Sequence, residues 1–160
     1  MNEVYLLTGG NMGDRPDYLE RARAAVSAAV GPVRAASSVY ETAAWGLEDQ
    51  PSFYNQVLCV DTELSAEDVL HAVLAIEQSL GRMRDVKYGP RTIDIDILFF
   101  NDAVIDHPAL VVPHPQMAFR RFVLAPLNEL APDKLHPVLK KTVGELLAAC
   151  PDKLAVHKIS

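Results

Sequence analysis

Residues 88–100 of the sequence read Tyr-Gly-Pro-Arg-Thr-Ile-Asp-Ile-Asp-Ile-Leu-Phe-Phe. Aspartate alternates with isoleucine at the centre of this stretch, between Ile93 and Ile97. Because successive side chains of an extended strand point to opposite faces, Asp94 and Asp96 share one face and the isoleucines share the other. The stretch therefore predicts a half-buried strand that packs its isoleucines into a core and holds two carboxylates side by side.

Two neighbouring carboxylates repel each other unless water, cationic side chains or a metal ion compensates their charge. The segment 81–91 carries four basic residues and one acidic residue, hence a net charge of +3, in a chain whose net charge is −6. Mg²⁺ is commonly bound by one or two carboxylates together with substrate phosphates. The combination indicates a site for a metal–polyphosphate complex, with guanidinium groups on the phosphate oxygens. An ordinary surface strand whose aspartates pair with these arginines is the alternative.

The order of predicted elements gives the fold class. Apolar patterns predict strands at 4–8, 33–40, 53–61 and 93–100, and Gly9 to Asp14 is expected to break the first of them. A helix capped by Asp14 or Asp17 follows the first strand, and a second helix begins after Ser65. This order is typical of an α+β, ferredoxin-like split βαβ core, with an antiparallel sheet and both helices on one face. Short helices at 123–130 and 142–149 and an edge strand at 154–159 are expected to complete it.

Three further positions are candidates for binding. Trp45, on the long loop 41–51, could form a flat slot for a heteroaromatic ring with Phe53 and Asn55, or could fill a small satellite core. Glu77 interrupts the apolar side of its helix and either points at the metal site or is solvated at the edge of that side. His114 lies between two prolines that restrict its backbone, which would suit a phosphate donor, although a loop histidine without a function is common.

Composition limits the class of protein further. A chain of 160 residues that is 49% hydrophobic fits one globular domain covering 1–160. The first residues do not resemble a signal peptide and no apolar run reaches membrane-spanning length, so we expect a cytoplasmic protein without membrane contact. A sequence pI near 5.3 argues against a general nucleic-acid binder. Cys59 and Cys150 lack metal-binding spacing and are expected to be buried thiols.

Several short motifs occur together along the chain. They are Gly-Arg-Met-Arg at 81–84, Gly-Pro-Arg-Thr-Ile-Asp-Ile-Asp-Ile-Leu at 89–98 and Val-Pro-His at 112–114, with Tyr-Glu-Thr at 40–42, Gln-Pro at 50–51 and Phe-Tyr-Asn at 53–55. In order and spacing they closely resemble the 6-hydroxymethyl-7,8-dihydropterin pyrophosphokinases of folate biosynthesis. The resemblance runs from Val4 to at least Leu130. It implies an enzyme that transfers the β,γ-diphosphate of ATP to the hydroxymethyl group of the pterin and releases AMP. We expect the protein to be a monomer.

The resemblance also implies roles for individual residues at the reacting phosphates. Asp94 and Asp96 would hold two Mg²⁺ ions that bridge the triphosphate, and Arg82 and Arg91 would stabilise charge on the moving phosphoryl groups. The implied nucleotide-binding residues are Glu77, Arg84, Leu98, His114 and Arg120, with Leu98 near the adenine.

A second set of residues is implied for the pterin. The ring would lie between Phe53 and Phe122. The residues expected around its edge are Thr42, Ala43, Trp45, Asn55 and Tyr88.

The chain departs from the pattern of the family at a few positions. Gly10 stands where a serine is usual, and Tyr88 where a tryptophan is frequent. Ala109, Val111 and Pro115 lie where some members place an arginine, a threonine and a tyrosine on ATP, which concerns nucleotide affinity more than reaction type. Two other functions are compatible with the sequence: a non-catalytic ferredoxin-like binding module, and a pyrophosphokinase for another alcohol.

Overall fold

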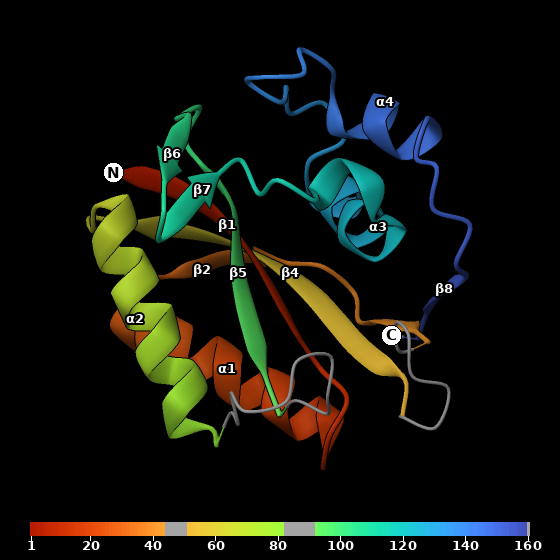
Figure 1. Cartoon of the computed structure of the whole chain (residues 1–160). Helices are drawn as coiled ribbons and strands as arrows, with labels where there is room; N and C mark the ends of the chain where they lie inside the picture. Colours follow the sequence, from red (N-terminus) through yellow and green to blue (C-terminus); the bar gives the residue numbers. More distant parts are fainter. Residues whose placement is uncertain (44–50, 82–91, 160) are drawn as a thin grey trace.

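The computed structural model describes residues 1–43, 51–81 and 92–159. In these ranges six strands form one antiparallel sheet in the order β5-β1-β4-β3-β8, with β2 paired to β4 beside β3 (Figure 1). The strands are β1 (Asn2–Gly10), β2 (Val33–Ala36), β3 (Tyr40–Thr42), β4 (Phe53–Thr62), β5 (Asp94–Phe100) and β8 (Val156–Lys158). A separate hairpin contains β6 (Ile105–His107) and β7 (Leu110–Val112).

Helices cover both faces of the sheet. The helices α1 (Arg15–Ala29) and α2 (Ala66–Ser79) pack on one face, where a core cluster includes Leu6, Val26 and Val73. The helices α3 (Arg121–Leu130) and α4 (Val143–Ala148) lie on the other side, as Figure 1 shows, around a second cluster that includes Leu7 and Leu124. A short 3-10 helix, η1 (Met117–Phe119), precedes α3.

The ferredoxin-like prediction is confirmed. The first six elements follow the expected order if β2 and β3 count as one strand, and α1 and α2 share a face of an antiparallel sheet. Asp14 caps α1 by accepting from the N–H of Asp17 at 3.1 Å, and Ser65 caps α2 in the same way. Satisfying these otherwise unpaired amides is the physical reason that such residues mark helix starts.

Two strand predictions were wrong in detail. The strand expected over 33–40 is divided into β2 and β3, because the Ser37 hydroxyl accepts a hydrogen bond from the N–H of Val57 at 2.9 Å and interrupts the regular ladder. Gly9 and Gly10 do not end the first strand but belong to β1. Gly9 pairs with Asn55 on one side and Asp94 on the other, and its missing side chain leaves room for the Asn55 amide.

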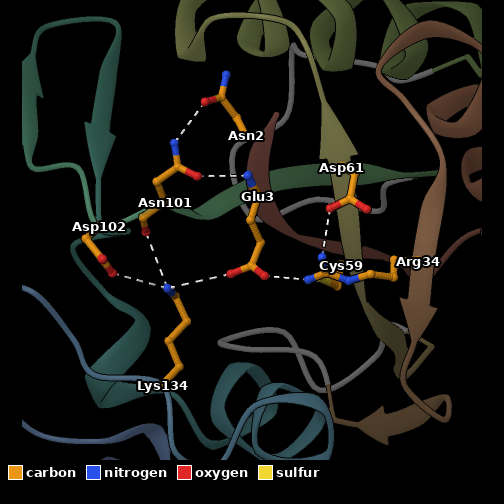
Figure 2. A network of polar contacts seen from close by, with 8 residues as sticks. All are labelled: Asn2, Glu3, Arg34, Cys59, Asp61, Asn101, Asp102 and Lys134. Atoms are coloured by element: carbon orange, nitrogen blue, oxygen red, sulfur yellow. Dashed lines mark hydrogen bonds and ion pairs between the residues drawn. The ribbon is translucent and has the colours of Figure 1, made fainter.

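The end of the sheet where β1 begins is fixed by charged side chains. Figure 2 shows Lys134 between Asp102 and Glu3, with its Nζ 3.5 and 3.9 Å from their carboxylate oxygens. Arg34 pairs with Glu3 and with Asp61 on β4. Opposite charges in this network therefore join β1, β2, β4 and the segment that follows α3.

Helix α3 is joined to β3 by a carboxylate. Glu129 accepts hydrogen bonds from the N–H of Ser38 at 3.0 Å and from the Tyr40 hydroxyl at 2.8 Å. Burial and the bond to Glu129 raise the pKa of Tyr40 to about 12. Burial also acts to raise the pKa of Glu129, but the bonds from Tyr40 and Ser38 outweigh it and lower that pKa.

Two expectations about the chain as a whole can be compared with the structure. Cys59 and Cys150 are buried free thiols, as expected. In the described ranges, every helix is too short or too polar to span a bilayer.

Candidate active site

The candidate site lies at the end of the sheet opposite Lys134. There the last residues of β1 meet the first residues of β4 and β5. Gly9 of β1 is paired with Asn55 and Asp94, and Leu7 is paired with Asp96. Because paired residues of an antiparallel ladder project to the same face, Asp94, Asp96 and Asn55 all project to the side on which Leu7 packs, which is the side of α3.

The face assignment made from the Asp–Ile alternation is confirmed. Ile93, Ile95 and Ile97 are buried in the core below α1 and α2, whereas Asp94 and Asp96 are half-buried on the opposite face. The two carboxylates therefore project together at the end of β5, on the face away from its apolar support.

His114 brings a titratable group within the electrostatic influence of Asp96. Burial lowers the pKa of His114, the Asp96 carboxylate opposes this by raising it, and the Arg120 guanidinium lowers it again, with a net decrease. These influences place His114 in the electrostatic field of both residues. Its Nδ1 accepts from the N–H of Gln116 at 3.2 Å, so the neutral ring carries its proton on Nε2.

The main chain holds His114 against β5. Its N–H donates to the carbonyl of Leu98 at 3.1 Å, and its own carbonyl accepts from the N–H of Met117 at 3.3 Å. The Leu98 side chain is fully buried in the cluster beneath α3. The structure therefore places Leu98 next to His114 as a support, and its predicted contact with adenine stays a prediction.

The two arginines at the start of α3 have different surroundings. Arg121 is tied to the C-terminal segment, because its Nε donates to the Asp152 carbonyl at 3.3 Å and its N–H donates to the Asp152 carboxylate at 3.1 Å. Arg120 instead influences His114 and lies 5.7 Å from the centre of the Phe122 ring. Of the two arginines, Arg120, selected from the sequence for the nucleotide, is the one whose charge acts on the pKa of His114; its contact with the nucleotide stays a prediction.

The residues predicted to contact a pterin are partly brought together. Asn55 and Thr42 are buried, and the Asn55 amide donates to the Thr42 hydroxyl at 3.3 Å. Phe53 and Phe122 are both half-buried. Phe53 projects to the same face of β4 as Asn55, and Phe122 packs against the cluster on that face. Ala43 is exposed beside Thr42.

Glu77 has a partner that the sequence did not indicate. Its side chain is buried, so the alternative of a solvated residue at the helix edge is wrong. The Glu77 carboxylate accepts a hydrogen bond from the main-chain N–H of Ile95, between the two aspartates, at 2.7 Å.

Five of the predicted site residues lie outside the described residues. They are Trp45, Arg82, Arg84, Tyr88 and Arg91. Their roles remain predictions from the sequence.

The sequence did not single out a polar cluster at the same end of the sheet. Asn11, which is fully buried, donates to the carbonyl of Pro51 at 3.1 Å. Arg15 at the start of α1 donates to the Ser52 hydroxyl at 2.8 Å and lies 4.0 Å from the centre of the Tyr54 ring. These contacts fix the start of β4, and thus the position of Phe53 and Asn55. They join residues about forty positions apart, a separation at which periodic patterns carry no signal.

The donor chemistry fits Mg²⁺. Asp94 and Asp96 supply hard oxygen ligands from one strand face, and two carboxylates suffice when phosphate oxygens and water complete the coordination. Across 1–43, 51–81 and 92–159, no three His, Cys, Asp or Glu side chains are grouped as a metal site. The two carboxylates therefore fit a metal that arrives with phosphates.

These observations first define a class: a ferredoxin-like α+β domain whose strand β5 carries a carboxylate pair on one face, with the charges of Asp96 and Arg120 both acting on His114, groups of the kind that phosphoryl transfer uses. The profile of the 7,8-dihydro-6-hydroxymethylpterin-pyrophosphokinase (HPPK) family matches residues 5–132. The chain belongs to this family.

Curated relatives and solved structures agree with this assignment. The chain is 41% identical over 152 residues to a 2-amino-4-hydroxy-6-hydroxymethyldihydropteridine pyrophosphokinase of Pseudomonas aeruginosa, covering 94% of this chain and 93% of the relative. The enzyme of the same name from Aquifex aeolicus is 40% identical over 145 residues, covering 91% and 90%. The crystal structure of Plasmodium falciparum HPPK-DHPS superimposes with a TM-score of 0.74 over 92% of this chain and 43% of that one. At 20% identity the last match supports the fold.

Proposed function

We propose that this chain transfers the β,γ-diphosphate of ATP to the hydroxymethyl group of 6-hydroxymethyl-7,8-dihydropterin. In this reaction the hydroxyl oxygen bonds to the β-phosphorus, and the bond from that phosphorus to the oxygen bridging the α-phosphate breaks. The hydroxyl loses its proton and AMP leaves. The observation that carries the proposal is that Asp94 and Asp96 project from one face of β5, where the charge of Asp96 also acts on His114.

Two Mg²⁺ ions held by Asp94 and Asp96 would neutralise the triphosphate and orient it for in-line displacement. His114 would donate the proton on Nε2 to a phosphate oxygen, since its Nδ1 is already occupied as an acceptor. Arg120 would place a guanidinium on the nucleotide. Because phosphoryl transfer depends mainly on positioning and charge neutralisation, these residues need not form a covalent bond with the substrate.

The pterin side of the proposal rests on β3, β4 and α3. Phe53 and Phe122 would enclose the ring, and Asn55 and Thr42 would bond to its polar edge. Both of these polar groups are buried, which favours strict recognition of a hydrogen-bonding ring, because an analogue without matching groups would leave them unpaired.

The proposal includes the remaining sequence predictions for the site and the protein. Arg82 and Arg91 would stabilise the transferred phosphoryl groups, Arg84 and Leu98 would contact the nucleotide, and Trp45, Tyr88 and Ala43 would border the pterin. We further propose one domain over 1–160 that acts as a cytoplasmic monomer on small molecules alone.

The decisive test is AMP formation from ATP and 6-hydroxymethyl-7,8-dihydropterin in the presence of Mg²⁺. We expect one AMP for each pterin diphosphate formed, and we expect Asp94→Ala and Asp96→Ala to lower the rate by at least about 100-fold, the scale for losing one preorganised charge contact. The thermal transition of each variant should show that it is folded. A well-folded parent that forms no AMP would contradict catalysis, and AMP formation with another alcohol but not with the pterin would contradict the substrate.

A further inference from the structure

Glu77 is a carboxylate at an otherwise apolar position of α2. Only 4% of its surface is exposed, and the same side of the helix carries the buried residues Val69, Val73 and Ile76. Burying a carboxylate is costly unless hydrogen bonds to the charged group compensate the loss of water. The Oε2 atom of Glu77 accepts such a bond from the main-chain N–H of Ile95, with 2.7 Å between nitrogen and oxygen. This contact links α2 directly to the strand that carries both aspartates.

The position of Ile95 in the ladder explains why its N–H is available to a side chain. Strand β5 is the outermost strand of the sheet, and Asp94 and Asp96 are paired with Gly9 and Leu7 of β1. In an antiparallel pair the main-chain groups of successive residues point alternately toward and away from the partner strand. The N–H of Ile95 therefore points to the edge, where the Glu77 carboxylate takes the place of a further strand.

The contact acts at the centre of the proposed metal site. Ile95 is the single residue between the two aspartates, so the orientation of its peptide groups decides how Asp94 and Asp96 project. A charge-assisted bond is shorter and stronger than one between neutral groups, and it restrains the strand at this point. Residues that orient metal ligands in this indirect way are a regular part of metal sites.

We propose that Glu77 is a positioning residue that holds the main chain of Ile95, so that Asp94 and Asp96 keep the spacing needed to bind the metal–triphosphate complex. The proposal rests on the proposed function. It differs from the role implied by family resemblance, in which Glu77 contacts the nucleotide itself.

Two substitutions separate these roles. Glu77→Gln removes the charge but keeps an oxygen that accepts the Ile95 N–H, whereas Glu77→Leu removes the acceptor at similar volume. Val73→Ala is the control for general loss of stability, because Val73 is buried on the same helix face. For each variant we would measure amide hydrogen exchange at Ile95, kcat, the KM values of both substrates and the Mg²⁺ concentration that gives half-maximal rate.

The expected results differ among the three variants. Glu77→Leu should lose protection at the Ile95 amide, lower kcat by roughly 10- to 100-fold and raise the half-saturating Mg²⁺ concentration, as is typical for losing an outer partner of a metal site. Glu77→Gln should keep the protected amide and recover kcat to within about threefold of the parent, because an amide oxygen replaces the acceptor. Val73→Ala should lower the thermal transition and leave kcat and the Mg²⁺ dependence unchanged.

Three outcomes would overturn the proposal. The first is that Glu77→Gln lowers kcat as much as Glu77→Leu does while its Ile95 amide stays protected, since the charge of Glu77 would then act on a ligand. The second is Glu77→Leu leaving either the amide exchange or the Mg²⁺ dependence unchanged. The third is Val73→Ala reproducing the kinetic loss. A parent protein that forms no AMP would refute the proposed function instead, and the Ile95 exchange data would still report whether Glu77 holds the strand.

Discussion

At the end of the sheet where β1 begins, Lys134 and Arg34 lie between the acidic side chains of Glu3, Asp61 and Asp102 (Figure 2). Toward the opposite end, the hydrogen bond from the Ile95 N–H to Glu77 fixes the main chain between two aspartates, and the bond from the His114 N–H to Leu98 holds β5 two residues beyond Asp96. Charged side chains lie at both ends, but at the first end they pair with one another and join segments of the chain. The second orders the backbone around carboxylates that stay half-buried.

This difference suggests how stability and activity are divided in the molecule. Pairing opposite charges within the chain compensates their burial and stabilises the fold, but it leaves those groups unsuited to a charged substrate. Holding the main chain of a strand that carries two half-buried carboxylates favours binding of a metal–phosphate complex instead. Substitutions at the two ends should therefore have different effects on unfolding and on turnover.

The largest expected difference comes from adding one methyl group at each end. A Cβ on Gly31 would lie 2.0 Å from the carbonyl oxygen of Asp61, and a Cβ on Gly9 would lie 2.1 Å from the Oδ1 of Asn55. Gly31→Ala collides with main chain and should destabilise the protein by about 3 kcal/mol or more, the upper range for overpacking. Gly9→Ala should displace the Asn55 side chain and lower kcat/KM for the pterin by about 100-fold, with a smaller loss of stability.

Urea unfolding and steady-state kinetics on the same preparations would measure both effects. If Gly9→Ala lowered the free energy of unfolding as much as Gly31→Ala and left kcat/KM unchanged, the two ends would not differ in the way described. Gly144→Ala is a milder control, because its added Cβ would lie 3.3 Å from its nearest neighbour, the Pro132 carbonyl oxygen.

Lys134→Met tests the charged network of Figure 2. The Lys134 ammonium lies 5.0 Å from the centre of the Phe99 ring, besides its contacts with Glu3 and Asp102, and its side chain is mostly buried. Removing the charge should lower the free energy of unfolding by about 1–3 kcal/mol, because the ammonium loses its contact with the Phe99 ring and the partly buried Glu3 loses a partner, whereas the exposed Asp102 adds little. The kcat of the folded protein should not change. A large fall in kcat with unchanged stability would show that this end of the sheet also serves the reaction.

Local patterns predicted much of this architecture. The alternation of aspartate with isoleucine identified both faces of β5, because side-chain direction in a strand depends only on position. Asp14 and Ser65 marked helix starts through contacts within three residues. The choice of Arg120 came from the family resemblance, and the structure places that guanidinium close enough to influence His114.

Contacts between distant residues could not be predicted in the same way. Helical spacing placed Glu77 on the apolar side of α2, but it could not reveal that the N–H of Ile95, eighteen residues later, would be the partner. The division of the strand over 33–40 depends on Ser37 meeting Val57, and the link from Tyr40 to Glu129 spans 89 residues. Such pairings are decided by how the elements pack, and no short window of sequence contains them.

The surroundings of His136 predict that stability depends on pH at the end of the sheet where β1 begins. Burial lowers its pKa, and its Nδ1 accepts from the N–H groups of Val138 and Leu139 at 3.2 and 3.0 Å. With a folded-state pKa below the ordinary value of 6.5, its contribution to stability is complete above pH 6.5 and is lost as the pH falls through the folded-state pKa.

His136→Asn is the matched variant for this prediction, because an asparagine oxygen can accept from the same amides and does not titrate. We would measure the midpoint temperature of thermal unfolding between about pH 5 and pH 8, the range in which histidine titrates. This temperature should fall less steeply toward acid pH in the variant than in the parent. Identical slopes would mean that His136 does not contribute to acid destabilisation.

The smallest expected effect is at Thr92, two residues before Asp94. Its hydroxyl oxygen is buried and finds no hydrogen-bond partner in the part of the chain that the structure describes. Replacing an unpaired buried hydroxyl with a methyl group of the same shape removes a desolvation cost, so Thr92→Val should raise the free energy of unfolding by up to about 1 kcal/mol. Urea unfolding without ligands measures this gain. The kcat of the same variant then decides whether Thr92 has a structural role or a role in the reaction. An unchanged kcat would mean that Thr92 only supports the fold. A fall in kcat despite higher stability would mean that its hydroxyl bonds to a group present only when the substrates are bound.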